Sequence, residues 1–78
     1  MKPQEILEEL DRLGISIFYR RFAPGLPTRL EVGLGRERAY PALLSALEAR
    51  TAELLRVASF ELSRHTPGTY VRRPGGAA

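Results

Sequence analysis

The sequence has no cysteine, one histidine and one lysine, and no long apolar run. Without cysteine the chain can form neither a disulfide framework nor a thiolate metal site, which is typical of proteins in a reducing compartment. The N-terminal residues lack the apolar core of a signal peptide, and nowhere do about 18 apolar residues follow one another, as a membrane helix requires. These absences predict a cytoplasmic protein with no membrane segment.

The length of the chain limits it to one domain. A fold of 78 residues has a small core, and folds of this size often gain stability by association. A hydrophobic content of 44% with 27% charged residues is typical of a globular domain and not of a disordered chain. We therefore expect a single domain over residues 1–64 that forms a homodimer, followed by a flexible tail over residues 65–78.

Positive charge is concentrated in the middle and at the end of the chain. The formal net charge is +3 at pH 7. Residues 1–14 carry two basic and four acidic side chains, net −2, whereas residues 15–40 carry five arginines and two glutamates, net +3. Residues 41–64 are balanced, and the tail adds two arginines. This distribution favours an acidic partner, either a carboxylate-rich peptide or a phosphate backbone.

A helix and a strand pair are predicted in the first half. Apolar residues at helical spacing predict a helix that begins near Pro3 and ends at Gly14. β-branched and aromatic residues dominate positions 15–22, which predicts a strand that is apolar on both faces. After a loop with two prolines, residues 29–34 alternate strictly. This alternation predicts a second strand whose inward residues are Leu30, Val32 and Leu34.

A long helix is predicted over residues 41–63, where leucines recur at helical spacing. It would span roughly 35 Å at the usual rise per residue, which is longer than a hairpin can cover. The helix must therefore break, with residues 57–60 as the place, or pack on a second copy of the chain. Residues 35–39 are predicted as a turn or a third-strand stub, and residues 69–71 could add a short edge strand. The fold class expected is α+β: helix, two-stranded antiparallel hairpin, long helix and flexible C-terminal tail.

Residues that could carry out a reaction are scarce. His65 stands at a predicted helix end and has no nucleophile paired with it. The serines of the predicted long helix follow neither a triad order nor a nucleophile-elbow pattern. Glu5 and Glu8 share a helix face but have no histidine to complete a metal site. The sequence therefore predicts no enzymatic activity, no metal and no cofactor.

The predicted hairpin is the candidate binding region. It could accept a partner peptide as an added strand, with arginines selecting acidic groups and phenylalanines as desolvated anchors. It could instead contact nucleic acid, with arginines on phosphates and aromatic rings stacked on bases. In a third interpretation the aromatic residues are buried under the long helix or in a dimer interface. The candidate partner-binding residues are Phe18, Arg20, Arg21, Phe22, Arg29 and Glu31.

The leucine pattern resembles a known family. EILEELDRLGISI at residues 5–17, then a strand pair, then LEARTAELL at residues 47–55, is similar to the TubC-type N-terminal docking domains of nonribosomal peptide and polyketide synthetases. The resemblance covers about residues 5–57 and rests on leucine patterns. It implies a dimeric helix–hairpin–helix fold that docks a short acidic C-terminal segment of a partner on residues 17–21 and 29–32. Arg50 and Thr51 stand where the family often has lysine.

We therefore expect a small non-catalytic interaction module, a free-standing adaptor or regulator, that binds an acidic partner segment at its basic hairpin. The alternative is a nucleic-acid-binding domain that resembles the double-stranded-RNA-binding type, which shares the order of helix, strands and helix. That type has a lysine-rich start to its second helix. Here Glu37 and Pro41 interrupt the corresponding stretch.

Overall fold

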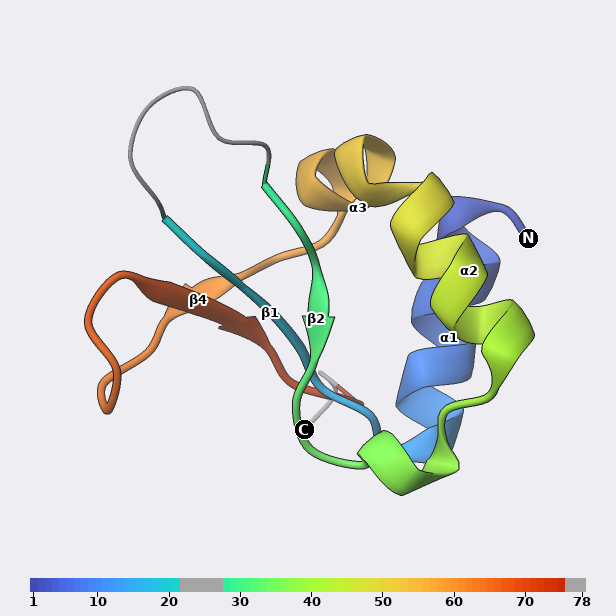
Figure 1. The fold of residues 1–78 in the computed structure, drawn as a ribbon, viewed down its shortest axis with the longest axis horizontal. Helices are drawn as coiled ribbons and strands as arrows, with labels where there is room; N and C mark the ends of the chain where they lie inside the picture. The colour runs from blue at the N-terminus through green and yellow to red at the C-terminus, as the bar shows by residue number, and fades with distance from the viewer. Residues whose placement is uncertain (22–27, 76–78) are drawn as a thin grey trace.

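Within residues 1–21 and 28–75, which the computed structural model describes, three α-helices pack against one face of a four-stranded antiparallel sheet (Figure 1). The sheet order is β2-β1-β4-β3, so β1 and β4 are the central strands. No helix in this part of the chain is long and apolar enough to cross a membrane. In chain order the elements are α1 (Pro3–Leu13), β1 (Ile17–Arg20), β2 (Glu31–Val32), the 3-10 turn η1 (Arg36–Arg38), α2 (Pro41–Ala49), α3 (Thr51–Val57), β3 (Glu61–Leu62) and β4 (Thr69–Arg72).

Helix α1 forms as its sequence predicts. Pro3 is its first residue, where a missing N–H costs nothing. Its end is set by Gly14, which has φ of 69° and donates its N–H to the carbonyl of Asp11, 3.2 Å away. Glycine adopts this left-handed conformation without steric cost. The buried face of the helix consists of Ile6, Leu7 and Leu10.

The core lies between the helices and one face of the sheet. Ile17 of β1 and Ile15, two residues before it, are both 0% exposed, and they belong to one core cluster with leucines of all three helices. Burial of one such aliphatic side chain stabilises the fold by about 1.5–3 kcal/mol. The core residues are Ile6, Leu7, Leu10, Ile15, Ile17, Leu43, Leu47 and Leu54.

The C-terminal part differs most from the prediction. The expected two-stranded hairpin with a flexible tail is wrong, because β3 and β4 form a second hairpin that completes a four-stranded sheet. Residues 69–71, expected at most as an edge strand, belong to a central strand that pairs with β1 from Ile17↔Arg72 to Arg20↔Thr69. Without β4, the backbone groups on that side of the apolar strand β1 would be unpaired.

The predicted long helix is two short helices. Arg50 has φ of −109° and ψ of 21°, which separates α2 from α3. Helix α3 then ends at Val57, and Ala58 is extended, with φ of −88° and ψ of 149°. The end of α3 falls at the edge of the region 57–60 where a break was predicted. The break at Arg50 was not predicted, because leucine spacing continues across it.

A β-bulge ends the pairing of β1 with β2. Ser16 faces two residues: its carbonyl accepts the N–H of Gly33 at 2.9 Å, while its own N–H donates to Leu34 at 3.0 Å. The Leu34 N–H also donates to the Ser16 hydroxyl, at 2.7 Å. A bulge shifts side-chain alternation by one residue, so Leu34 is 74% exposed and the prediction that it points inward is wrong. Leu30 and Val32 do pack against the core.

The stretch between β2 and α2 contains neither a strand nor a plain turn but the 3-10 turn η1. Arg38 of η1 reaches the end of α1, where its guanidinium donates to the carbonyls of Leu13 and Gly14. A cation at these carbonyls is favourable because the C-terminus of a helix carries partial negative charge. Arg38 thus fixes the start of the α2 segment relative to α1.

Candidate partner-binding site

The structure divides the predicted site between the two faces of the sheet. Phe18 and Glu31 lie directly opposite each other. They point away from the helices, because side chains alternate along a strand and Ile17, the residue before Phe18 in β1, is in the core. The Arg20 guanidinium carbon is 5.7 Å from the centre of the Phe18 ring. Arg21 instead lies over Tyr70, at 5.7 Å. Arg29 is exposed just before β2, and Phe22 lies outside the described residues.

The aromatic residues of β1 have different environments. Tyr19 belongs to an aromatic cluster on the helix-facing side, with ring centres 5.0 Å from Phe60 and 5.2 Å from Tyr70. Phe18 is half-buried on the outer face beside Gly33, where a Cβ atom added to the glycine would lie 3.4 Å from the Phe18 ring. Phe18 thus covers a residue that has no side chain of its own. Neither ring is a fully exposed anchor.

The strand β2 leaves one edge of the sheet open. Gly33 directs its N–H toward β1, where it binds Ser16. Successive residues of an extended strand direct their N–H and C=O groups to alternate sides. Val32 therefore presents these groups to the open edge, and Leu30, the residue before β2, would do the same if the alternation continues to it. An unpaired strand edge is a template on which another extended chain can add.

A groove of about 510 Å³ lies beside this edge, between β2 and α2. In Figure 1, β2 runs toward η1, and α2 runs back alongside it. Leucines from both walls give the groove an apolar part, and among them Leu44 is 43% exposed. Two arginines and two glutamates line it as well. The lining residues are Thr28, Arg29, Leu30, Glu31, Val32, Arg36, Ala39, Leu44, Leu47, Glu48 and Thr51.

The charged side chains that line the groove are exposed. Arg29, Glu31, Arg36 and Glu48 are all exposed, and none of them takes part in an ion pair within residues 1–21 and 28–75. Other arginines are engaged: in the described part of the chain the ion pairs are made by Arg12, Arg38, Arg50 and Arg72. Arg29 and Glu31 were predicted from the sequence, whereas Arg36 and Glu48 were not. Those two reach the edge only because η1 and α2 turn back beside β2.

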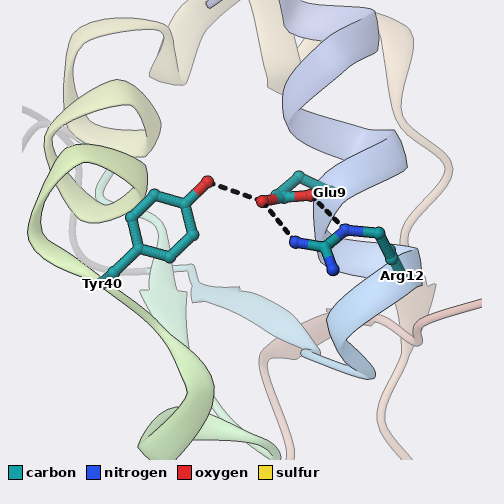
Figure 2. A network of polar contacts seen from close by, with 3 residues as sticks. All are labelled: Glu9, Arg12 and Tyr40. Carbon is teal, nitrogen blue, oxygen red and sulfur yellow. Dashed lines mark hydrogen bonds and ion pairs between the residues drawn. The ribbon is translucent and has the colours of Figure 1, made fainter.

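A polar network fixes the α2 wall of the groove (Figure 2). Tyr40, the residue before α2, donates its hydroxyl to Glu9 of α1 at 2.6 Å, and Arg12 donates to the same carboxylate at 2.7 Å. The hydrogen bonds from Arg12 and then from Tyr40 lower the pKa of Glu9 to about 2. The same bond to the Glu9 carboxylate raises the pKa of Tyr40. Glu9 therefore remains ionised and holds α2 in place at neutral pH.

The residues of the described part that could carry chemistry do not gather in one place. His65 lies exposed in the β3–β4 connection, where its backbone N–H donates to the Ser63 hydroxyl at 3.2 Å. Among the described residues no group of three or more His, Cys, Asp or Glu side chains could hold a metal ion.

Comparisons of the chain with protein-family models, curated proteins and solved structures find no match. A functional hypothesis therefore depends on the open edge and its groove.

Proposed function

We propose that the protein is a non-catalytic interaction module that takes an extended, acidic segment of a partner protein as an added strand on β2. The observation that supports this most is the open β2 edge beside a groove of about 510 Å³. The outward N–H and C=O groups of Leu30 and Val32 would supply main-chain hydrogen bonds. Such bonds give affinity without regard to sequence, so selectivity must come from the side chains of the groove.

The groove favours a segment with alternating apolar and acidic residues. In an added strand alternate side chains point to one face, so every second residue would face the leucines of the groove. The exposed Leu44 would then be desolvated, which is favourable in proportion to the apolar area removed from water. Arg29 and Arg36 would donate charge-assisted hydrogen bonds to carboxylates. Glu31, which borders the groove from the outer face, and Glu48 of α2 disfavour a continuous run of acidic residues.

The family resemblance supports the same proposal. TubC-type docking domains are expected to bind an acidic C-terminal segment on their hairpin, and the order α1, β1, β2 and then helices agrees with what the resemblance implies. The hairpin of β3 and β4 goes beyond that expectation. An interaction role does not require the synthetase context of the family, because a fold does not determine the function built on it.

Nucleic acid is the weaker candidate on the outer face. Phe18 and Arg20 would have to stack on bases and bind phosphates there. One row across the sheet runs from Glu31 through Phe18 and Val71 to Glu61. One exposed carboxylate, that of Glu31, therefore lies beside the aromatic ring and another, that of Glu61, lies at the far end of the row, and both would repel a phosphate backbone. The edge groove has apolar area that a peptide would use and phosphates would not.

The proposal is tested with an eight-residue fluorescent peptide that alternates aspartate and leucine, at protein concentrations low enough to keep the chain monomeric. We expect binding that Arg36→Glu weakens at least ~10-fold, equivalent to about 1.4 kcal/mol. The matched control is Arg56→Glu on α3, an exposed residue away from the groove, which should bind as the wild type does. Amide resonances of Leu30 and Val32 should shift on titration. Equal binding of a lysine–leucine peptide, or equal weakening by both substitutions, would count against the proposal.

A further inference from the structure

The three residues Arg29, Leu30 and Glu31 are complementary to themselves. If two copies of this segment run antiparallel with Leu30 opposite Leu30, each Arg29 lies opposite the other copy's Glu31. Directly opposed residues of antiparallel strands point to the same face with their side chains about 5 Å apart, and opposite charges at such positions attract. Both residues are exposed and have no ion-pair partner within residues 1–21 and 28–75.

The backbone of the edge permits this alignment. Gly33 faces β1 through its hydrogen bond to Ser16, so by alternation Glu31 faces β1 as well. Continued by one residue to Leu30, which directly precedes β2, the same alternation turns its N–H and C=O to the open edge. A two-fold axis at Leu30 would let the N–H of each copy's Leu30 donate to the C=O of the other. The hydrogen-bonding direction and the charge pattern therefore agree on the same central residue.

We propose that residues 29–31, which are the first residue of β2 and the two residues before it, pair antiparallel with the same segment of a second copy, centred on Leu30, so that one sheet continues across a two-fold dimer. Two Arg29–Glu31 pairs would lie on the outer face, one on each side of the axis. The two Leu30 side chains would lie on the helix-facing side, at the mouth of the groove that Leu44 lines. The pairing would cover part of the exposed area of Leu44.

Neighbouring alignments lose these contacts. With the axis at Glu31, the two Glu31 carboxylates would oppose each other, which is destabilising. With the axis at Val32, Glu31 would lie opposite Gly33, and the bulge at Gly33 and Leu34 would interrupt the pairing. In a two-fold antiparallel pair, odd-numbered residues must lie opposite odd-numbered residues and even-numbered opposite even-numbered, because only then do opposed side chains point to the same face of the sheet. Only the alignment at Leu30 pairs both charges.

The contact is small, so the dimer is a weak one. A strand pair of a few residues buries less than the ~1,200–2,000 Å² of stable interfaces, and its population will depend on protein concentration. The dimer uses the edge to which the proposed function assigns the partner peptide, but it does not require that such a peptide exists. If both bind, they compete: self-pairing covers the edge, and a peptide that binds more tightly displaces the second copy.

The test uses charge reversal in the full chain, followed by sedimentation equilibrium over a wide concentration range. Arg29→Glu alone and Glu31→Arg alone each place like charges opposite, and each should weaken self-association at least ~10-fold. An equimolar mixture of the two variants should form a heterodimer, because the opposed pairs are then again of opposite sign. The double variant Arg29→Glu with Glu31→Arg should dimerise as the wild type does. Circular dichroism and thermal unfolding verify that each variant is folded.

Several results would overturn the proposal: a wild type that stays monomeric at the highest concentration, single variants that dimerise like the wild type, or a mixture that does not associate. Hydrogen exchange of the wild type provides a second readout without substitution, since the amide of Leu30 should become protected as concentration rises. Peptide binding by the dilute monomer is measured separately. Loss of the dimer with retained peptide binding refutes self-pairing alone, and the reverse result refutes the peptide proposal alone.

Discussion

The two hairpins of the sheet are fixed to α1 to different degrees. β4 pairs with β1 at four positions, and Arg72 at its end forms two hydrogen bonds with Asp11 of α1, at 3.0 and 3.2 Å. β2 pairs with β1 at two positions before the bulge. On the β2 side of the sheet, α1 binds Tyr40, the residue before α2, and not β2 itself. Stability is therefore concentrated between β1 and β4, and β2 is left as an open edge of the sheet.

The largest effect is expected at the centre of the sheet. Ile17 is 0% exposed and lies between Val32 of β2 and Arg72 of β4. Ile17→Ala should lower the free energy of unfolding by about 2–5 kcal/mol, because it removes buried carbons and leaves a cavity. Urea unfolding measures it. Leu34→Ala, at a 74% exposed residue, is the control and should change stability by less than about 0.5 kcal/mol. Similar losses for both would show that β1 is not the centre of the core.

A smaller effect is expected where α1 holds the C-terminal hairpin. Asp11 accepts hydrogen bonds from Arg72 and from the N–H of Gly75 at 2.8 Å, and only 13% of the Arg72 side chain is exposed. Asp11→Ala would leave that guanidinium without its partner. The free energy of unfolding should fall by about 1–3 kcal/mol. The lower end of this range is expected because the Asp11 side chain is 35% exposed.

Hydrogen exchange locates this effect. The amides of β4 should exchange faster in Asp11→Ala, whereas those of α2 should change less. Glu8→Ala, one helical turn away at an exposed residue, is the matched control. Burial raises the pKa of Asp11, but the hydrogen bonds from Arg72 and Gly75 outweigh it and leave the pKa lowered. The contribution of Asp11 is therefore present above the ordinary carboxyl range and is lost as pH falls below it.

The contrast between the hairpins also explains what the sequence could predict. The first hairpin contains Ile15, Ile17 and Tyr19, which belong to a segment rich in β-branched and aromatic residues. Such a composition favours a strand without any information from the rest of the chain. In the second hairpin Leu62 continues the leucine spacing of the preceding helices, so local pattern favours helix there. The strand at β4 depends on the unpaired side of β1, which is far away in sequence. Residues 69–72 therefore form a strand because the backbone groups of β1 require hydrogen-bond partners, and this requirement acts over a long distance in sequence.

The candidate site was predictable only in part, for a similar reason. Glu31 belongs to β2 and Arg29 lies two residues before it, so the alternating sequence pattern is sufficient to find both. Arg36 and Leu44 reach the groove because η1 and α2 turn back beside β2. Arg38 was indistinguishable from Arg36 in the sequence, yet it binds the carbonyls at the end of α1. Which arginine is free depends on tertiary packing and not on residue type.

The smallest effect is expected at Glu9, the counterpart of Asp11 on the groove side of α1. Hydrogen bonds from Arg12 and Tyr40 lower its pKa to about 2, so the unfolded chain binds its proton more readily than the folded one. Stability should therefore fall as pH falls from about 5 to about 2, and this part of the fall should be absent in Glu9→Gln. Urea midpoints measured across that pH range give the comparison, with Glu8→Gln as control. Parallel pH profiles for the wild type and Glu9→Gln would mean that Tyr40, and with it the α2 wall, is held mainly by packing.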